Sequence, residues 1–375
     1  MPHRHIKSIA IAGAWGYIGR KFLQAALDLG LETYVHDPGP LPADLDLKGF
    51  HRLDDEAAFY SLDVDLYHLA LHPEHRARAF ELLLQEHPGA PLILAEKPMA
   101  APERPEQCAE LSTAVELSRA PMLFDFPELF DAMTQRIVDF LTGFKQLSIK
   151  RVELRRSKDR EDPSNPRNYK KIVPVQYQES VHCLAFVLYL LSHLRGGLAA
   201  QMGTGLRARA QAAPYTPPNP ESYSYRVDGR CRYSLDLGEL HLEGITDFSR
   251  GAPWSKRRLI EGVGDGHPFA IEADYLEGAK YLRIDGIDQG FNPDASTYQQ
   301  VLERLSAWQA AGNFSQRLET HPDPAFATLT YQLSSLLWRA SRDNTALHLP
   351  SLAALRNFDA GFAAAVASFP AYNPD

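Results

Sequence analysis

Short apolar runs alternate with amphipathic stretches over the first 125 residues. The apolar runs, each the length of a buried strand, are 6–12, 32–36, 66–71, 91–96 and 121–126. Between them, residues 17–29, 75–87 and 101–118 carry apolar side chains at helical spacing. Strands that alternate with helices through short turns predict a parallel sheet covered by helices. We therefore expect an α/β domain over residues 1–124.

The pattern changes after residue 125. Residues 146–156 alternate as a half-exposed strand does, and residues 180–191 form an apolar helical stretch. Further alternating stretches are 223–229, 232–238, 239–248, 257–263, 270–276 and 281–286. Residues 211–221 (QAAPYTPPNPE) have the composition of a surface loop. Three helical patterns follow residue 296, and the last, 350–368, could pack back on the first domain. We expect a second, α+β domain with a mostly antiparallel sheet over residues 125–375.

Composition narrows the class of protein. The chain has 375 residues, of which 45% are hydrophobic and 23% charged, as in globular proteins. A net charge of −8 argues against a nucleic-acid partner or an anionic membrane surface. Cys108, Cys183 and Cys231 are far apart, without the spacing of a zinc site or a disulfide framework. With no apolar run long enough for a signal peptide or a membrane span, we expect a cytoplasmic protein without a metal site.

A glycine-rich turn lies between the first predicted strand and helix. It reads Gly13-Ala-Trp15-Gly16-Tyr17-Ile18-Gly19. Glycine is required where such a turn is tight, where backbone approaches a pyrophosphate and where helix meets strand. The spacing is GxxGxxG rather than GxGxxG, and similar turns also occur without a ligand. We interpret the segment as the cofactor-binding turn of a Rossmann domain.

Asp37 follows the second predicted strand, 18 residues beyond Gly19. A carboxylate there can accept hydrogen bonds from ribose hydroxyls, and its charge would repel a 2′-phosphate. We therefore favour NAD over NADP. Two alternatives stay open: Asp37 is a turn former before Pro38, and Arg20 leaves NADP as a second cofactor.

The predicted strand 91–96 ends at Glu96, and Lys97 and Pro98 follow directly. Ligands of doubly wound sheets bind at this end of the strands. Proline restricts the backbone, and Glu96 could orient the ammonium of Lys97. A lysine beside a nicotinamide can donate or accept a proton as hydride moves. The alternative is a solvated loop lysine.

At this point the sequence resembles the Gfo/Idh/MocA oxidoreductases, the glucose-fructose oxidoreductase and inositol dehydrogenase family. The resemblance rests on the glycine turn, on Glu96-Lys97-Pro98, and on Leu69-Ala-Leu71-His72-Pro73-Glu-His75, which is similar to the family's ATP-x-x-H region. It extends to the helix around His182 and to residues 350–368, which are similar to the family's terminal helix.

The resemblance implies a site and an activity. Leu71, His72, His75, Glu96 and Lys97 would join the glycine turn and Asp37 in binding NAD(P). An open, mostly antiparallel sheet would carry the substrate and make the contacts of a homodimer or homotetramer. The activity would be hydride transfer between NAD(P) and a sugar, a cyclitol or a related carbonyl or alcohol.

The chain departs from the family in its second domain. Members commonly carry an aspartate four residues before the helix histidine, where this chain has Gln178, followed by Glu179. Glutamine cannot act as a base, although it can hydrogen-bond a hydroxyl. Lys97 and His182 are therefore the candidate proton-transfer groups, with Gln178, Glu179 and Tyr169 as substrate contacts. His182 could instead be a buried structural residue.

Three other functions compete with this interpretation. A dihydrodipicolinate-type reductase would share the opening turn, but it predicts a shorter chain and a His-His-Lys cluster that the sequence lacks. An imine or enamine reductase on the same fold would need no base to deprotonate an alcohol. A non-catalytic dinucleotide-binding sensor or scaffold would explain Gln178.

Overall fold

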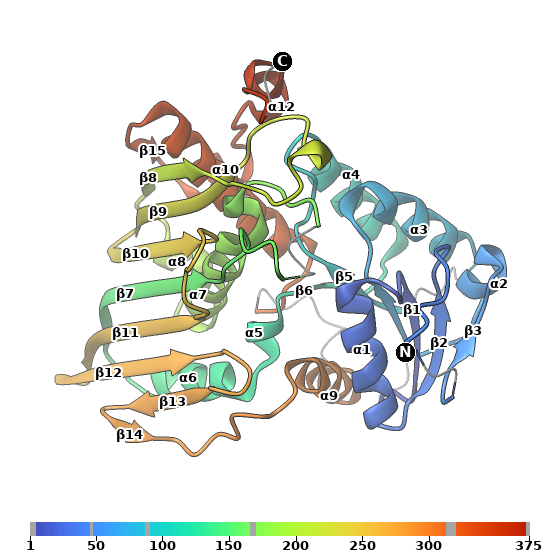
Figure 1. The fold of residues 1–375 in the computed structure, drawn as a ribbon. Coiled ribbons are helices and arrows are strands. Elements are labelled where there is room, and N and C mark those ends of the chain that lie inside the picture. Colours follow the sequence, from blue (N-terminus) through green and yellow to red (C-terminus); the bar gives the residue numbers. More distant parts are fainter. Residues whose placement is uncertain (1–4, 46–47, 87–90, 166–169, 313–319, 373–375) are drawn as a thin grey trace. The chain divides into compact units, whose positions relative to one another are not determined.

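The computed structural model describes residues 5–45, 48–86, 91–165, 170–312 and 320–372 (Figure 1). The chain divides into two compact units. The first contains residues 1–101, 106–132 and 295–327. The second contains residues 102–105, 133–294 and 328–375. From sequence, residues 295–327 were expected in the second domain, whereas they group with the first unit.

The first unit is built on a parallel six-stranded sheet. Its strands are β1 (Ser8–Ala12), β2 (Glu32–His36), β3 (His51–Arg52), β4 (Leu66–Leu69), β5 (Leu92–Glu96) and β6 (Met122–Asp125). They lie in the order β3-β2-β1-β4-β5-β6, with every neighbouring pair parallel. The central strands are buried along nearly their whole length, which explains their unbroken apolar runs. This is the strand order of a dinucleotide-binding domain, and the order reverses between β1 and β4.

Helices of the first unit alternate with these strands. They are α1 (Tyr17–Asp28), α2 (Glu56–Tyr60), α3 (Pro73–Glu86), α4 (Gln107–Ser118), α5 (Pro127–Phe130) and α9 (Thr297–Ala310). Helix α1 buries Phe22, Leu23 and Ala26 at helical spacing. The ring of Phe22 also contacts Tyr298 of α9, with centroids 5.2 Å apart. This contact gives the physical reason for grouping α9 with the first unit.

The second unit contains a nine-stranded mixed sheet. Its strands are β7 (Leu147–Ser157), β8 (Leu206–Pro214), β9 (Asp228–Leu237), β10 (Leu240–Asp247), β11 (Arg257–Gly264), β12 (His267–Asp274), β13 (Tyr281–Ile284), β14 (Ile287–Asp288) and β15 (Leu347–Leu349). The order is β14-β13-β12-β11-β7-β10-β9-β8-β15. Strands β7 and β10 are parallel, and the other neighbouring pairs are antiparallel.

One face of this sheet packs against helices. The helical elements are α6 (Ala132–Thr142), η2 (Gln176–Ser180), α7 (Val181–His193), α8 (Gly197–Gln201), η3 (Pro220–Ser222), α10 (Pro324–Asp343), α11 (Leu352–Arg356), α12 (Phe362–Ala365) and η5 (Val366–Ser368). Helix α7 is buried along almost its whole length and contacts β7. Along β9 the buried residues alternate with exposed ones such as Arg230 and Arg232. The expected fold class, a Rossmann domain followed by an α+β unit with an open, mostly antiparallel sheet, is confirmed.

Three local predictions were wrong. Residues 211–214, expected in a loop, are the end of β8 and pair with β9. Residues 223–227, expected in a strand, precede β9. Residues 350–368 form α11, α12 and η5 instead of one helix, because Gly361 adopts a φ of +67° that interrupts helical geometry. Within the described residues, no helix is long and apolar enough to cross a membrane.

Candidate functional site

The glycine turn of the first unit has the close contacts that its sequence suggests. Gly13 has a φ of +76°, and a Cβ there would lie 2.7 Å from the carbonyl oxygen of Ala70. A Cβ on Gly19 would lie 2.2 Å from the carbonyl oxygen of Gly13. Neither position accepts a side chain without a backbone shift. Gly16 precedes α1 and makes no side-chain capping bond, and a helix N-terminus of this kind can bind an anion.

Asp37 lies at the end of β2 and binds the glycine turn. Its Oδ2 accepts a hydrogen bond from the backbone N–H of Trp15 at 2.9 Å, and its Oδ1 accepts one from Gly39 at 2.9 Å. The indole Nε1 of Trp15 is buried, and within the described residues it has no hydrogen-bond partner. Tyr17 and Ile18 are the first two residues of α1. The predicted cofactor residues of this segment therefore lie together.

Arg20, the residue that keeps NADP as a second possible cofactor, forms a bidentate ion pair with Asp44 at 2.8 Å. The hydrogen bond from Arg20 lowers the pKa of Asp44, and the same bond raises the pKa of Arg20. Both side chains are at the surface, where such a pair contributes little to stability. A 2′-phosphate would have to compete with Asp44 for this guanidinium.

The segment after β4 begins at the carboxyl end of its strand, as the glycine turn does after the neighbouring parallel strand β1. Leu71 approaches the turn, since its Cδ2 would lie 3.1 Å from a Cβ on Gly13. His72 and His75 are exposed, and the backbone N–H of His75 donates to the carbonyl oxygen of His72 at 3.0 Å. All three stay cofactor-binding predictions, and of these Leu71 contacts the glycine turn.

Glu96 ends β5, and the half-buried Lys97 follows it. The loop after Lys97 is held by Arg76 of α3, a residue that the sequence analysis missed. Its guanidinium donates to the carbonyl oxygens of Pro98 at 3.0 Å and Met99 at 3.2 Å. Burial lowers the pKa of Arg76 to about 10, and the charge of Glu96 opposes this shift. The feature of the sequence that could have identified Arg76 is its position among the apolar residues on one face of a predicted helix.

In the second unit, Glu179 lies in η2, a π-helical segment directly before α7. Segments of this kind occur often at functional sites. Its buried carboxylate accepts hydrogen bonds from Arg156 Nε and Lys158 Nζ. Arg156 lies in β7, and Lys158 directly follows that strand. Burial lowers the pKa of Lys158 to about 7, and the attraction of Glu179 opposes the shift. Neither cation was predicted from the sequence, because they lie 21 and 23 residues before their partner.

Two further predicted residues of the second unit, Gln178 and His182, lie on the same helical stretch as Glu179. Gln178 is half-buried, and His182, one helical turn after Glu179, is buried at 5% exposure. Tyr169 lies outside the described residues. Gln178, Glu179 and His182 are therefore neighbours along one helix, and their substrate roles stay predictions.

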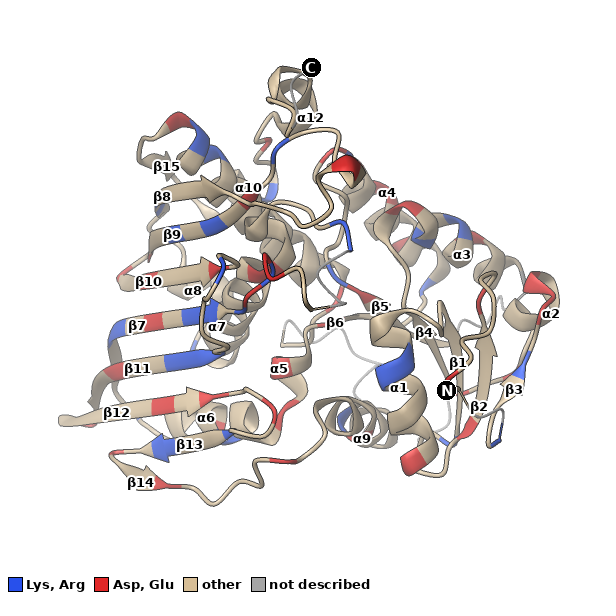
Figure 2. Cartoon of the chain, viewed as in Figure 1, with Lys and Arg blue, Asp and Glu red and all other residues tan. Residues whose placement is uncertain are grey.

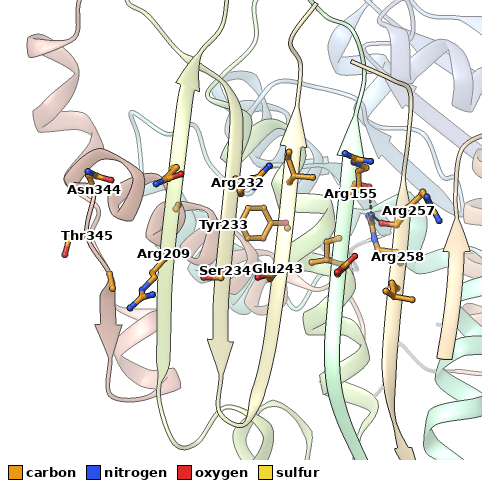
Figure 3. Close-up of a pocket in the computed structure, with 18 of the residues that line it drawn as sticks. Arg155, Arg209, Arg232, Tyr233, Ser234, Glu243, Arg257, Arg258, Asn344 and Thr345 are labelled. Atoms are coloured by element: carbon orange, nitrogen blue, oxygen red, sulfur yellow. Dashed lines mark hydrogen bonds between the residues drawn. The ribbon is translucent and has the colours of Figure 1, made fainter. Parts of the chain in front are cut away.

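An open pocket of about 770 Å³ lies on the sheet of the second unit (Figure 3). It contains none of the predicted site residues. Its charged lining residues are Glu153, Arg155, Arg209, Arg232, Glu243, Arg257, Arg258 and Glu272. Figure 2 shows basic and acidic segments side by side across these strands. Such a mosaic is suited to another protein surface.

No protein-family model and no curated protein matches the sequence. Solved structures do match. A myo-inositol dehydrogenase from Corynebacterium glutamicum is 13% identical with a TM-score of 0.67, covering 92% of this chain and 99% of that one. An oxidoreductase from Agrobacterium radiobacter, solved with NAD+, L-tartaric acid and magnesium, is 14% identical with a TM-score of 0.68, covering 91% and 97%. The chain has the fold of these two proteins.

The same fold occurs in a regulator. A super-repressor mutant of Gal80p from Saccharomyces cerevisiae is 12% identical with a TM-score of 0.68, and the match covers 94% of this chain and 99% of that one. The Gal80p of Kluyveromyces lactis is described as a transcriptional regulator. The resemblance to the Gfo/Idh/MocA oxidoreductases is thus confirmed as one of fold, which enzymes and regulators share.

Proposed function

We propose that this chain is an NAD(P)-dependent oxidoreductase that transfers hydride between nicotinamide and a small polar carbonyl or alcohol, such as a sugar, a cyclitol or a derivative. The observation that carries the proposal is the position of Lys97. It follows β5, at the same carboxyl edge of the parallel sheet as the glycine turn after β1. A cofactor-binding turn and a proton-transfer group thus belong to one unit.

The residues present fit a dinucleotide. Gly13 and Gly19 leave room for backbone contacts that a Cβ would block, and the uncapped N-terminus of α1 offers N–H groups to a pyrophosphate. Asp37 puts a negative charge beside this turn, and Arg20 is already paired with Asp44. These charges favour NAD over NADP.

Lys97 would exchange the substrate proton in this reaction. Bound NAD(P) would accept or supply the hydride. The ammonium of Lys97 would donate its proton to a carbonyl oxygen during reduction, and the amine would take it back during oxidation. Arg76 would keep the loop after Lys97 in place through its bonds to Pro98 and Met99.

The second unit would supply the substrate contacts. His182 would be the second proton-transfer group, and Gln178 would hydrogen-bond a substrate hydroxyl. Glu179 would mainly hold Arg156 and Lys158 in position, because its carboxylate already binds both side chains. Lys158, with a pKa of about 7, could exchange a proton at neutral pH. Tyr169 stays a predicted contact outside the described residues.

The test is to compare Lys97→Met with the wild-type protein. We expect NADH binding, measured by fluorescence titration, to be retained, while turnover falls by a factor on the order of 10²–10⁴. Ketone, imine and polyol panels would identify the reaction. Near-normal turnover of Lys97→Met would exclude Lys97 as the proton-transfer group.

A non-catalytic dinucleotide sensor is the second candidate. Two observations on residues 178–182 favour it. Residue 178 is a glutamine, and Glu179, which carries the carboxylate of this stretch, already binds Arg156 and Lys158. NADH binding without turnover on any panel would support it. Turnover of imines alone would favour an imine or enamine reductase.

A second copy of the chain is the proposed partner, in a homodimer or homotetramer. The open sheet face carries Arg209 and Arg232 together with Glu243 and Glu272 in one pocket. A two-fold axis would set this patch against itself, so basic and acidic positions could pair across the interface.

A further inference from the structure

Three titratable side chains from neighbouring strands meet beneath the Glu96–Lys97–Pro98 turn. They are His68 of β4, Glu96 of β5 and Asp125 of β6. Asp125 is paired with Glu96, and His68 is paired with Leu94, two residues before Glu96. Since paired residues and alternate residues of a strand share one face of a sheet, the register places all three on one face. One nitrogen or oxygen from each lies within 4.8 Å of the others.

The cluster is closed to solvent. His68 is 0% exposed, Asp125 1% and Glu96 9%. The ring of Phe22 from α1 covers His68, with centroids 3.9 Å apart. His68 Nε2 lies 3.5 Å from Glu96 Oε1. Within the described residues, both ring nitrogens of His68, both oxygens of Asp125 and Oε1 of Glu96 lack an ordinary hydrogen-bond partner.

Two buried carboxylates at this spacing must be compensated by a proton or by a cation. The charged groups that act on them are Lys97, next to Glu96 in the chain, and Arg76 of α3. The thiol of Cys108 on α4, whose pKa burial raises, lies near Arg76. Burial and the neighbouring Glu96 raise the pKa of Asp125 well above its usual range, and Lys97 only partly offsets this.

A proton suits the geometry better than a metal ion. Ligand bonds of about 2.1 Å would require ligand atoms roughly 3.4 Å apart. His68 and Glu96 meet this spacing, but the cluster extends to 4.8 Å and would have to contract. A shared proton needs only Asp125 and Glu96 to be in hydrogen-bond contact, and such a contact with Glu96 is one cause of the raised pKa of Asp125. Arg76 and Lys97 supply positive charge nearby.

We propose that Asp125 carries a proton at neutral pH and donates it in a hydrogen bond to Glu96, so that His68, Glu96 and Asp125 form one buried unit with a single shared acidic proton beside Lys97. Asp125 is then a positioning residue. It holds Glu96 from the buried side, directly before the residue proposed to exchange the substrate proton. The protonation of Asp125 does not depend on the proposed function and can be tested without an activity.

Infrared spectroscopy tests the proton directly. At pH 8 we expect the wild-type protein to show the carbonyl stretch of a protonated carboxylic acid, shifted in D₂O and absent from Asp125→Asn. Asparagine keeps the shape and a hydrogen-bond donor toward Glu96. The control is Asp65→Asn, which alters another buried aspartate of the first unit, one that accepts hydrogen bonds from the N–H groups of Lys7 and Ser8. This control should keep the band. A wild-type protein without the band would overturn the proposal.

The pH dependence of stability provides a second test. Above pH of about 4 the unfolded chain releases the aspartate proton, whereas the folded chain keeps it, so rising pH destabilises the wild-type fold at this position. Asp125→Asn has no such proton. Its Tm relative to the wild type should therefore increase from pH 5 to pH 8.

Two results would contradict the shared proton. A Tm difference that shrinks or reverses toward pH 8 would show that Asp125 is ionised in the folded chain. Equimolar Zn²⁺ or Mn²⁺ that stays with the dialysed wild-type protein and is lost in Asp125→Asn would show that a cation takes the place of the proton.

Discussion

The carboxylate of Asp37 accepts a hydrogen bond from the backbone N–H of Trp15 at 2.9 Å. This bond joins the end of β2 to the glycine turn after β1, and the second carboxylate oxygen binds the N–H of Gly39. The residue thus has a structural role in the turn as well as a charge placed to select a cofactor. The two roles can be separated by substitution.

We expect Asp37→Ala to weaken NADH binding by about tenfold, the effect of losing about 1.4 kcal/mol, and to reduce discrimination against NADPH. Alanine removes the charge and the acceptor together. Asp37→Asn keeps an acceptor for Trp15, so it should preserve most of the NADH affinity while still relaxing discrimination. Fluorescence titration with both cofactors measures the two effects. Unchanged affinities in Asp37→Ala would refute the assignment.

Gly19→Ala should disrupt the turn. Its Cβ would lie 2.2 Å from the carbonyl oxygen of Gly13, and the backbone shift should cost about 1–3 kcal/mol. We expect a lower Tm and loss of NADH binding. The matched control is Gly30→Ala at the other end of α1, where a Cβ meets open space but φ is +67°. It should lower Tm while leaving NADH binding intact. Equal binding by both variants would contradict the prediction.

Lys158 should make the stability of the second unit depend on pH. Its folded pKa is about 7, below that of a lysine in the unfolded chain. As pH falls from about 10 toward 7, the unfolded chain gains this proton first, so stability is lost by up to about 1.4 kcal/mol per pH unit. Partial exposure of the side chain should reduce that slope. Thermal unfolding should show it in the wild type.

The slope should disappear in Lys158→Met. Lys150→Met, which alters an exposed lysine of β7, the strand that ends directly before Lys158, should keep it. A wild-type slope that survives in Lys158→Met would mean that another group produces it.

Arg232→Glu should weaken self-association. Arg232 and Glu243 both line the open pocket, and reversing the charge of Arg232 would put like charges together across a two-fold interface. Light scattering during size-exclusion chromatography measures the mass. We expect a shift from the oligomer toward the monomer. The control Lys145→Glu alters an exposed residue outside the pocket and should keep the oligomer. A wild-type monomer would exclude the proposed partner.

Most of the first unit could be predicted from sequence. Strands such as β1 and β5 are buried along nearly their whole length, so they appear as unbroken apolar runs. The terminal helix was mispredicted because the apolar pattern of residues 350–368 continues through Gly361, whose backbone conformation the pattern does not contain. Strand β8 was not predicted. Alanine and proline at its end, residues 211–214, have loop-like composition, while pairing with β9 decides their state.

The sequence by itself determined the glycine turn, the Glu96–Lys97–Pro98 segment and the helix around His182, because each is local and carries its own residue pattern. The tertiary structure decided which side chains meet them. Arg76 reaches Pro98 from helix α3. Two cations, one in β7 and one directly after it, bind Glu179. Strand register brings His68 and Asp125 to Glu96. These contacts join residues far apart in the chain, so no local spacing encodes them.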